Sequence, residues 1–231
     1  MLAKNKTFQR IVGGSFLERQ GINMITRMQF MQLGTHKDPH LLKHLKRVRR
    51  ERSSLVTGRE MFMIHSFAKA QATQPGDFAE VGVFQGSTAR IMCEVKGDKR
   101  LRLFDTYEGL PKDCDKDSGV HKEKQYACSL ESVSKYLEEF PNVTYHKGLF
   151  PDSAADVPDA KYAFVHFDVD LYEGTLACLE YFYPKMITGG IMVSHDYSIL
   201  EGVKTAFTEF FADKQENVIE LPETQCMVIK I

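Results

Sequence analysis

Acidic side chains and one histidine follow two short apolar runs of the sequence. Asp168-Val169-Asp170 follows one run, and His195-Asp196 follows the next. Because the carboxyl ends of parallel strands meet at one edge of a sheet, these residues are expected to converge there. Carboxylate and imidazole groups are suitable ligands for a divalent cation such as Mg²⁺ or Mn²⁺. We predict a metal site formed by Asp168, His195 and Asp196, with a metal-free polar cluster as the alternative.

Asp170 is the candidate catalytic base. It lies two residues beyond Asp168, on the same side of an extended chain or at the start of the following loop. There it could take a proton from a substrate hydroxyl whose pKa the cation lowers. The alternative is a cap on the helix expected from Glu173. The D-x-D pattern of Asp168-Val169-Asp170 also fits a glycosyltransferase that holds a nucleotide-sugar diphosphate through manganese.

A glycine turn follows an earlier apolar run, in Glu80-Val81-Gly82-Val83-Phe84-Gln85-Gly86-Ser87-Thr88. Gly82 and Gly86 allow the backbone to turn sharply against a ligand, and a helix is expected from about Ser87. The dinucleotide fingerprint G-x-G-x-x-G places amides on a pyrophosphate, but its middle glycine is missing here. An acid before the turn suits the ammonium and sulfonium groups of S-adenosylmethionine (SAM). An ordinary turn between strand and helix is the alternative.

Two further segments could contact the rest of the same cofactor. Asp105, at the end of the second run, could accept hydrogen bonds from both hydroxyls of a ribose, or could cap a helix. Lys147-Gly148-Leu149-Phe150-Pro151-Asp152 offers an apolar wall and free backbone amides for an adenine ring, although Asp152 could simply cap the next turn.

The order of elements that must position these residues predicts the fold class. From residue 77 onward, β-rich runs alternate with helical patterns near 87–96, 129–139, 173–185 and 201–213, which indicates a mainly parallel sheet covered by helices. The expected strands are 77–82, 101–105, 142–147, 162–168, 190–195, 217–221 and 226–231. Only four residues separate the last two, so they must pair as an antiparallel hairpin. We predict an α/β, Rossmann-like class I methyltransferase fold: a seven-stranded, mostly parallel sheet with an antiparallel terminal hairpin and an N-terminal helical segment.

The segment before this sheet is predicted to be helical. We divide the chain into a helical arm or lid, 1–72, and a SAM-binding catalytic domain, 73–231. Asp38-Pro39 and Thr57-Gly58-Arg59-Glu60 are helix starts. Methionines at 24, 28 and 31 indicate an adaptable surface that covers the active site or a partner. Residues 1–52 carry 12 Lys and Arg against 3 Asp and Glu, so this segment is basic and the rest of the chain is acidic. Its solvated basic helix face could also contact an anionic substrate or a partner subunit.

Composition excludes several classes of protein. With 231 residues, 43% hydrophobic and 26% charged, the chain is an ordinary globular protein. No apolar run is long enough to span a membrane and no signal peptide is visible, so we expect a cytoplasmic location. The five cysteines show no C-x-x-C pairing, which argues against a disulfide framework or zinc site. Nucleic-acid binding is electrostatically possible but not expected, because aromatic residues are not interleaved with the basic ones in the way that a platform for single strands requires. Pro39 separates His36 from His40 and His44, so these histidines are not expected to hold a metal.

Taken together, five segments resemble the macrocin O-methyltransferase (TylF-type) family. They are Pro75–Val83, Phe104–Pro111, Lys147–Asp152, Asp168–Thr175 and Tyr183-Pro184-Lys185 through Gly189-Gly190, and they match in order between about residues 54 and 200. The resemblance implies a class I fold, SAM as methyl donor, methylation of a sugar hydroxyl on a natural product, magnesium and a homo-oligomer, for example a homodimer.

Carried over residue by residue, the resemblance assigns a cofactor site. It implies that Glu80, Gly82 and Gly86 line the methionine part, that Asp105 binds the ribose, and that Leu149 and Phe150 line the adenine. The predicted cofactor site also includes Ser87, Thr106, Gly148 and Asp168. Two departures matter. The family's Trp-Arg-Gly-Gly turn is Phe84-Gln85-Gly86-Ser87 here, and its paired Asp-Asp is His195-Asp196. Because imidazole is a poorer magnesium ligand than carboxylate, the ion could be manganese or another transition metal, or absent.

We therefore predict a SAM-dependent O-methyltransferase that acts on a hydroxyl of a sugar or a related small natural-product acceptor, assisted by a divalent metal. A metal-dependent glycosyltransferase and a non-catalytic methyltransferase-like protein are the alternatives. The sequence does not identify the acceptor.

Overall fold

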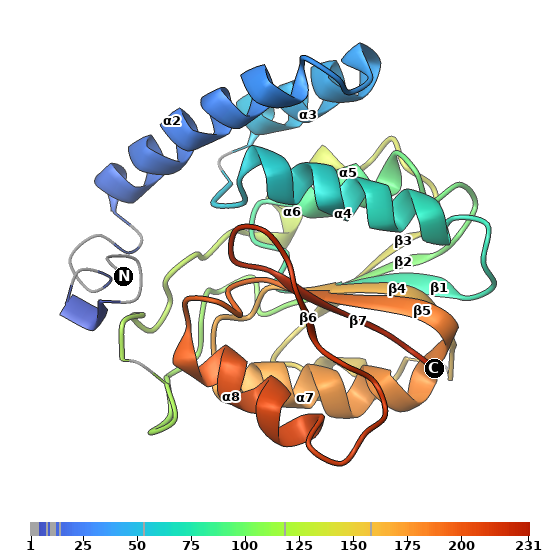
Figure 1. Cartoon of the computed structure of the whole chain (residues 1–231). Helices are drawn as coiled ribbons and strands as arrows, with labels where there is room; N and C mark the ends of the chain where they lie inside the picture. Colours follow the sequence, from blue (N-terminus) through green and yellow to red (C-terminus); the bar gives the residue numbers. More distant parts are fainter. Residues whose placement is uncertain are drawn as a thin grey trace.

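The computed structural model describes residues 5–7, 9, 13, 15–52, 54–117, 119–157 and 159–231. Among the described residues, three long helices precede the sheet, and strands then alternate with helices up to a closing hairpin (Figure 1). The elements are α2 (Phe16–Leu33), α3 (Pro39–Glu51), α4 (Gly58–Gln71), β1 (Asp77–Val81), α5 (Ser87–Cys93), β2 (Leu101–Asp105), α6 (Leu130–Tyr136), β3 (Val143–Lys147), η2 (Asp152–Ala154), β4 (Tyr162–Phe167), α7 (Tyr172–Phe182), η3 (Tyr183–Lys185), β5 (Met186–Ser194), α8 (Glu201–Phe210), β6 (Ile219–Glu220) and β7 (Cys226–Ile229).

One seven-stranded sheet forms the centre, in the order β3-β2-β1-β4-β5-β7-β6. Strands β1 to β5 run parallel, whereas β7 pairs antiparallel with both β5 and β6. The chain order reverses direction between β1 and β4, which creates the crevice where open α/β sheets bind ligands. The predicted fold class, including the antiparallel terminal hairpin, is confirmed.

Two strands differ most from their predicted limits. β5 begins at Met186 instead of Gly190, because Met186 already pairs with Tyr162 before a register irregularity. Gly189, with a φ of +80°, lies in that irregular stretch. β6 is only Ile219–Glu220, since its exposed edge position gives it two paired residues with β7 and no second neighbour.

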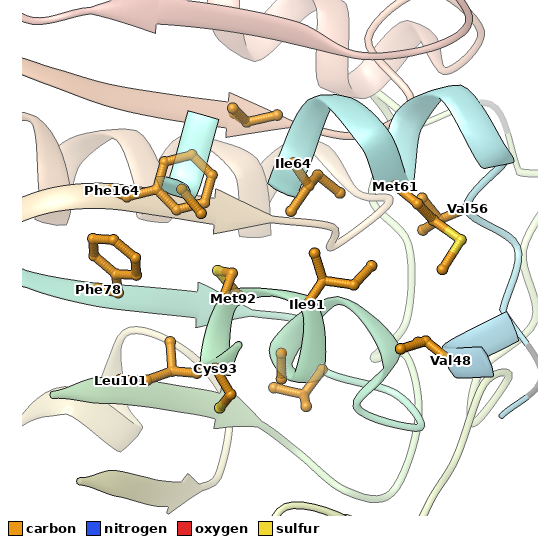
Figure 2. Close-up of a cluster of buried hydrophobic side chains, with 14 of the residues drawn as sticks. Val48, Val56, Met61, Ile64, Phe78, Ile91, Met92, Cys93, Leu101 and Phe164 are labelled. Carbon is orange, nitrogen blue, oxygen red and sulfur yellow. The ribbon is translucent and has the colours of Figure 1, made fainter. Parts of the chain in front are cut away.

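Both faces of the sheet are covered by helices (Figure 1). Helices α4 and α5 pack on one face, and α3 packs against these two helices. One hydrophobic cluster there contains Phe78 and Phe164 of the strands together with Ile64, Ile91 and Val48 of the helices (Figure 2). Helices α7 and α8 cover the opposite face with a second, aromatic-rich cluster. These two cores fix the carboxyl ends of the strands, where the predicted site residues lie.

The predicted helix starts in the N-terminal segment are confirmed. The Asp38 side chain accepts a hydrogen bond of 2.8 Å from the His40 backbone N–H. Thr57 and Glu60 form a reciprocal capping box at the start of α4. Helix α3 buries Leu45 and Val48 completely and exposes most of its basic residues, whereas Arg49 turns inward and donates hydrogen bonds to the Val56 carbonyl and to Asn23 Oδ1.

Helices α3 and α4 share one hydrophobic core with the sheet, so they are part of the folded body. The boundary at 72/73 stays a prediction. Part of the predicted arm, residues 1–4, 8, 10–12 and 14, lies outside the described residues. Within the described part of the chain, no helix has both the length and the apolar character needed to cross a membrane.

Candidate active site

A cavity of about 870 Å³ opens above the carboxyl ends of β1, β2, β4 and β5. This volume suits a ligand of cofactor size together with part of an acceptor. Eleven of the predicted site residues line the cavity: Gly82, Ser87, Asp105, Thr106, Gly148, Leu149, Phe150, Asp168, Asp170, His195 and Asp196. Residues separated by more than a hundred positions in the sequence thus line one cavity, and their convergence agrees with the prediction from the strand ends.

The two remaining predicted residues do not line the cavity. Glu80 is fully buried below the turn, where its carboxylate accepts a short hydrogen bond from Thr88 and lies 3.0 Å from His166 Nδ1. Burial raises the pKa of Glu80 above its ordinary value, although His166 opposes the rise. Gly86 caps α5 with a φ of +79° and faces Val133. Both residues support the turn from the side that faces away from the cavity. They can therefore influence a bound ligand only through the residues that line the cavity.

Gly82 is required by the close approach of β1 and β4. Its φ is +82°, and a Cβ atom there would lie 1.9 Å from the Asp168 carbonyl oxygen. The Asp168 N–H also donates a hydrogen bond of 2.9 Å to the Val81 carbonyl. This position therefore sets the spacing between the cofactor turn and the acids that follow β4.

Asp105 holds the glycine turn in place. Its Oδ2 accepts hydrogen bonds from the backbone N–H groups of Val83, at 2.7 Å, and Phe84, at 2.9 Å. Its Oδ1 accepts a third bond of 2.7 Å from the Tyr107 N–H. The sequence suggested only a ribose contact or a helix cap for Asp105. In the structure the same carboxylate braces the turn after β1 and still borders the cavity.

The segment after β3 forms an apolar part of the wall. Phe150 is buried against Phe104, with ring centroids 5.3 Å apart, and stacks on Phe182 at 5.4 Å. Leu149 remains 52% exposed and borders the open cavity. Phe150 is thus a fixed part of the core, and Leu149 is the apolar side chain that is free to contact a ligand.

Asp168, His195 and Asp196 converge as predicted. His195 Nδ1 lies 3.1 Å from Asp196 Oδ1 and 3.6 Å from Asp168 Oδ1. One ligand atom from each residue falls within 4.8 Å of the others. Asp170 lines the same cavity and interacts electrostatically with Asp168 and Asp196, which brings the predicted base to the same cluster. Asp170 and Asp196 have φ angles of 60° and 59°, a left-handed conformation that costs free energy and concentrates at functional sites.

Burial and mutual charge shift the pKa values of the cluster in different directions. Burial raises the pKa of Asp168 to about 6, against the attraction of His195. Burial, reinforced by Asp168 and Asp196, raises the pKa of Asp170 well above its usual range. Burial alone would disfavour the charged forms of Asp196 and His195, but their mutual attraction prevails. The pKa of Asp196 falls to about 2 and that of His195 rises.

The donor set fits a divalent cation. His195 is only 7% exposed, yet neither of its ring nitrogens forms a hydrogen bond of good geometry. Buried polar atoms without such a bond are uncommon in native proteins and often mark a missing ligand or ion. Because acids outnumber the single imidazole around this point, a cation held by Asp168, His195 and Asp196 would balance the excess negative charge.

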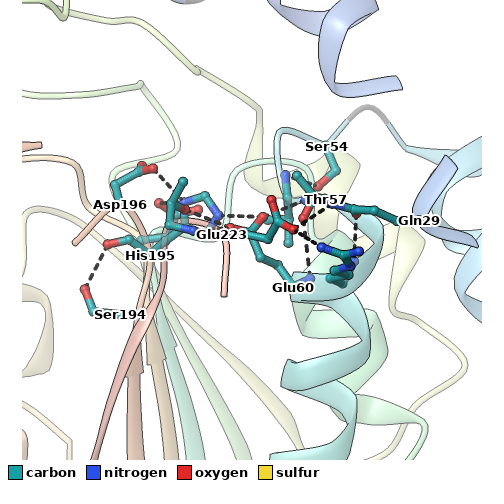
Figure 3. A network of polar contacts seen from close by, with 12 residues as sticks. Gln29, Ser54, Thr57, Glu60, Ser194, His195, Asp196 and Glu223 are labelled. Carbon is teal, nitrogen blue, oxygen red and sulfur yellow. Dashed lines mark hydrogen bonds and ion pairs between the residues drawn. The ribbon is translucent and has the colours of Figure 1, made fainter. Parts of the chain in front are cut away.

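Glu60 is a site residue that the sequence predicted only as a helix cap. It comes from α4, is 1% exposed, and places Oε2 at 3.3 Å from His195 Nε2 (Figure 3). Burial opposes its ionisation, but the charge of His195 lowers the pKa of Glu60 to about 2. The capping signal at Thr57 was visible in the sequence. The contact with His195 depends on tertiary packing and had no local signal.

The acceptor side of the cavity also contains residues that the sequence analysis did not identify. Ile22 and Ile25 of α2 form one wall, and His121 and Tyr126 of the loop between β2 and α6 form another. The Tyr126 ring packs edge-on against Phe84, with centroids 5.8 Å apart. Neither α2 nor this loop carries a recognisable motif.

Sequence comparison identifies relatives that are named O-methyltransferases. The chain is 30% identical over 141 residues to 8-demethyl-8-(2,3-dimethoxy-alpha-L-rhamnosyl)-tetracenomycin-C 4'-O-methyltransferase of Streptomyces olivaceus, covering 54% of each chain. It is 27% identical over 154 residues to demethyldecarbamoylnovobiocin O-methyltransferase of Streptomyces niveus, covering 60% of this chain and 59% of the relative. The matched region thus spans little more than half the length of these curated relatives.

Comparison with solved structures supports the fold. The O-methyltransferase NovP superposes with a TM-score of 0.70 at 23% sequence identity, covering 77% of this chain and 81% of NovP. The family model described as Macrocin-O-methyltransferase (TylF) matches residues 54–226, which include every predicted site residue. The chain therefore belongs to the macrocin O-methyltransferase (TylF) family.

Proposed function

We propose that this protein transfers the methyl group of SAM to a hydroxyl of a sugar or related small natural-product acceptor, assisted by a divalent cation. The observation that carries the proposal is one cavity bordered both by the Asp105-braced glycine turn and by the acids after β4 and β5. A methyl donor bound at the turn and an acceptor bound at the acids would share this space. The family to which the chain belongs, and the names of its relatives, support the same reaction.

The methyl donor would lie along the carboxyl ends of β1, β2 and β3. Gly82 and Ser87 would face its methionine part, Asp105 and Thr106 its ribose, and Leu149 its adenine. Asp105 can serve both roles, because a carboxylate offers about four acceptor positions and three are taken by backbone N–H groups. Glu80 and Gly86 would act indirectly, by holding the turn.

Methyl transfer is a direct displacement, so alignment and deprotonation are the tasks of the protein. The acceptor oxygen forms a bond to the methyl carbon as the carbon–sulfur bond breaks, which leaves S-adenosylhomocysteine (SAH). Asp170 would accept the hydroxyl proton from its position beside Asp168 and Asp196. A cation held by Asp168, His195 and Asp196 would lower the pKa of that hydroxyl. Ile22 and Ile25 of α2 would help to exclude water.

Calorimetric titration separates this proposal from the two alternatives. We expect SAM and SAH to bind, and a uridine-diphosphate sugar with Mn²⁺ not to displace them. Binding of the sugar nucleotide without SAM binding would favour the glycosyltransferase. SAM binding without methyl transfer to any member of a panel of sugar and glycoside acceptors would favour the non-catalytic protein.

Substitution of Asp170 tests the proposed base. Asp170→Asn should abolish turnover and leave the SAH dissociation constant within about threefold of the wild type, because the side chain keeps its size. Asp115→Asn, at an exposed position outside the cavity, is the matched control. Unchanged turnover in Asp170→Asn would remove Asp170 from this role.

We also propose that α2, within the predicted arm 1–72, acts as a lid over the cavity that it lines, and that the protein is a homo-oligomer. Met24, Met28 and Met31 recur along one side of α2 at helical spacing, and each is at least 60% exposed. A stripe of this kind is typical of a helix that packs against another helix. The basic N-terminal segment and the acidic remainder of the chain favour a second copy as the partner. Light scattering should show an oligomer that Met28→Glu dissociates.

A further inference from the structure

Glu60 connects three parts of the chain that are distant in sequence (Figure 3). Oε2 accepts a hydrogen bond of 2.8 Å from the Thr57 N–H, and Oε1 accepts bonds from the N–H and the hydroxyl of Thr224, at 3.1 and 2.8 Å. Oε2 also lies 3.3 Å from His195 Nε2. The carboxylate is therefore fixed by α4 and by the β6–β7 loop, independently of His195.

A fixed anion beside one ring nitrogen determines what the other nitrogen can do. A cation between Nδ1 and the two aspartates would displace the proton from Nδ1, and Glu60 would stabilise the proton that remains on Nε2. Nδ1 is the atom that faces Asp168 Oδ1 and Asp196 Oδ1. Histidines that bind metals usually have such a carboxylate partner on the opposite nitrogen, which orients the ring and makes it a better ligand.

We propose that Glu60 is the positioning residue of the cation site, holding His195 so that Nδ1 serves as a metal ligand beside Asp168 and Asp196. This inference rests on the divalent-cation part of the proposed function. One imidazole nitrogen and two carboxylate oxygens favour a transition metal such as Mn²⁺ over Mg²⁺, which prefers oxygen ligands. The ion-binding site would then depend on the helix α4, which precedes the predicted catalytic domain.

The proposal is tested by a double-mutant cycle on the full chain, with Mn²⁺ affinity measured by calorimetry. Glu60→Gln should weaken Mn²⁺ binding about 10- to 100-fold when His195 is present. In the His195→Asp background the same change should matter less than about threefold, because a carboxylate ligand has no ring to orient. Thr224→Val is the matched control: it removes one hydrogen bond to the far oxygen Oε1, and Mn²⁺ affinity should stay within about threefold of wild type.

A merely structural role for Glu60 predicts a different result. The loss of Mn²⁺ affinity would then be equal in the wild-type and His195→Asp backgrounds, or Thr224→Val would reproduce it. Either outcome overturns the proposal, as does a wild-type protein that binds no Mn²⁺. Titration of the same samples with SAH distinguishes failure of this proposal from failure of the methyltransferase proposal. A protein that binds SAH but not Mn²⁺ would contradict the role of Glu60 and leave the methyltransferase proposal intact.

A second measurement needs no variant and guards against a Glu60→Gln protein that does not fold. Long-range proton–nitrogen spectra of the wild type saturated with diamagnetic Zn²⁺ report which ring nitrogen of His195 carries the proton. We expect protonated Nε2 and metal-bound Nδ1. The opposite assignment, with the proton on Nδ1, would overturn the proposal.

Discussion

Gly82→Ala is the substitution whose effect follows most directly from the geometry. An alanine there meets two separate penalties, the left-handed φ of +82° and a Cβ atom 1.9 Å from the Asp168 carbonyl oxygen. The first costs about 1–2 kcal/mol. The second forces the ends of β1 and β4 apart by more than about 1 Å, with an overpacking cost of about 1–3 kcal/mol. We expect a total destabilisation of about 2–5 kcal/mol.

Gly97→Ala supplies the matched control, because Gly97 has a φ of +60° but no atom within 4 Å of a built Cβ. The Gly97→Ala variant should be destabilised only by the left-handed backbone conformation, which costs about 1–2 kcal/mol. Urea unfolding followed by circular dichroism measures both variants, and calorimetry measures SAH binding. Gly82→Ala should also weaken SAH binding at least tenfold, since the turn and the acids no longer keep their spacing. Equal destabilisation of the two variants, or normal SAH binding by Gly82→Ala, would refute this reasoning.

Three further predictions concern other parts of the chain. Burial lowers the pKa of His65 from 6.5 to about 4, so stability should fall as the pH drops from 6.5 to 4, because the unfolded chain binds the proton first. The free energy of unfolding lost between pH 6.5 and 4 should be smaller in His65→Gln by up to about 3 kcal/mol, as measured by urea unfolding at several pH values. The same pH dependence in His65→Gln and the wild type would contradict this prediction. Leu45→Ala, at a fully buried position, should cost about 2–5 kcal/mol in the same cooperative transition as the sheet; a separate early transition would show instead that α3 unfolds independently. Leu149→Ala should raise the SAH dissociation constant about fivefold, equivalent to about 1 kcal/mol, with little change in stability, and an unaltered constant would remove Leu149 from the adenine contact.

The order and type of the elements were predictable from the sequence because they depend on local patterns. Apolar runs marked the strands, and the short gap between residues 221 and 226 required the hairpin. The start of β5 was misplaced, because Gly189-Gly190 resembles a strand boundary when its pairing with β4 is unknown. The length of β6 likewise depended on its edge position.

The candidate site was predictable where residues follow strand ends, and was missed where they come from elsewhere. Asp105, Asp168 and Asp196 lie at strand ends, so topology alone predicts that they meet. Their finer roles could not be read locally, since the three backbone bonds to Asp105 depend on how the turn folds back. Glu80 was expected beside the ligand because of its motif, but pairing of β1 with β4 directs it toward His166 inside the sheet.

The shared carboxylate of Glu60 has a consequence for recombination between members of this family. A natural way to change acceptor preference is to join the N-terminal helices of one member to the sheet of another. In a chimera of this chain, residue 60 would come from one parent, and its contact residues 195 and 224 would come from the other. A mismatch would leave a charge buried without its partner, which typically costs about 3–5 kcal/mol. Crossovers should therefore keep α4 with the sheet and fall before Thr57, so that only α2 and α3 are exchanged.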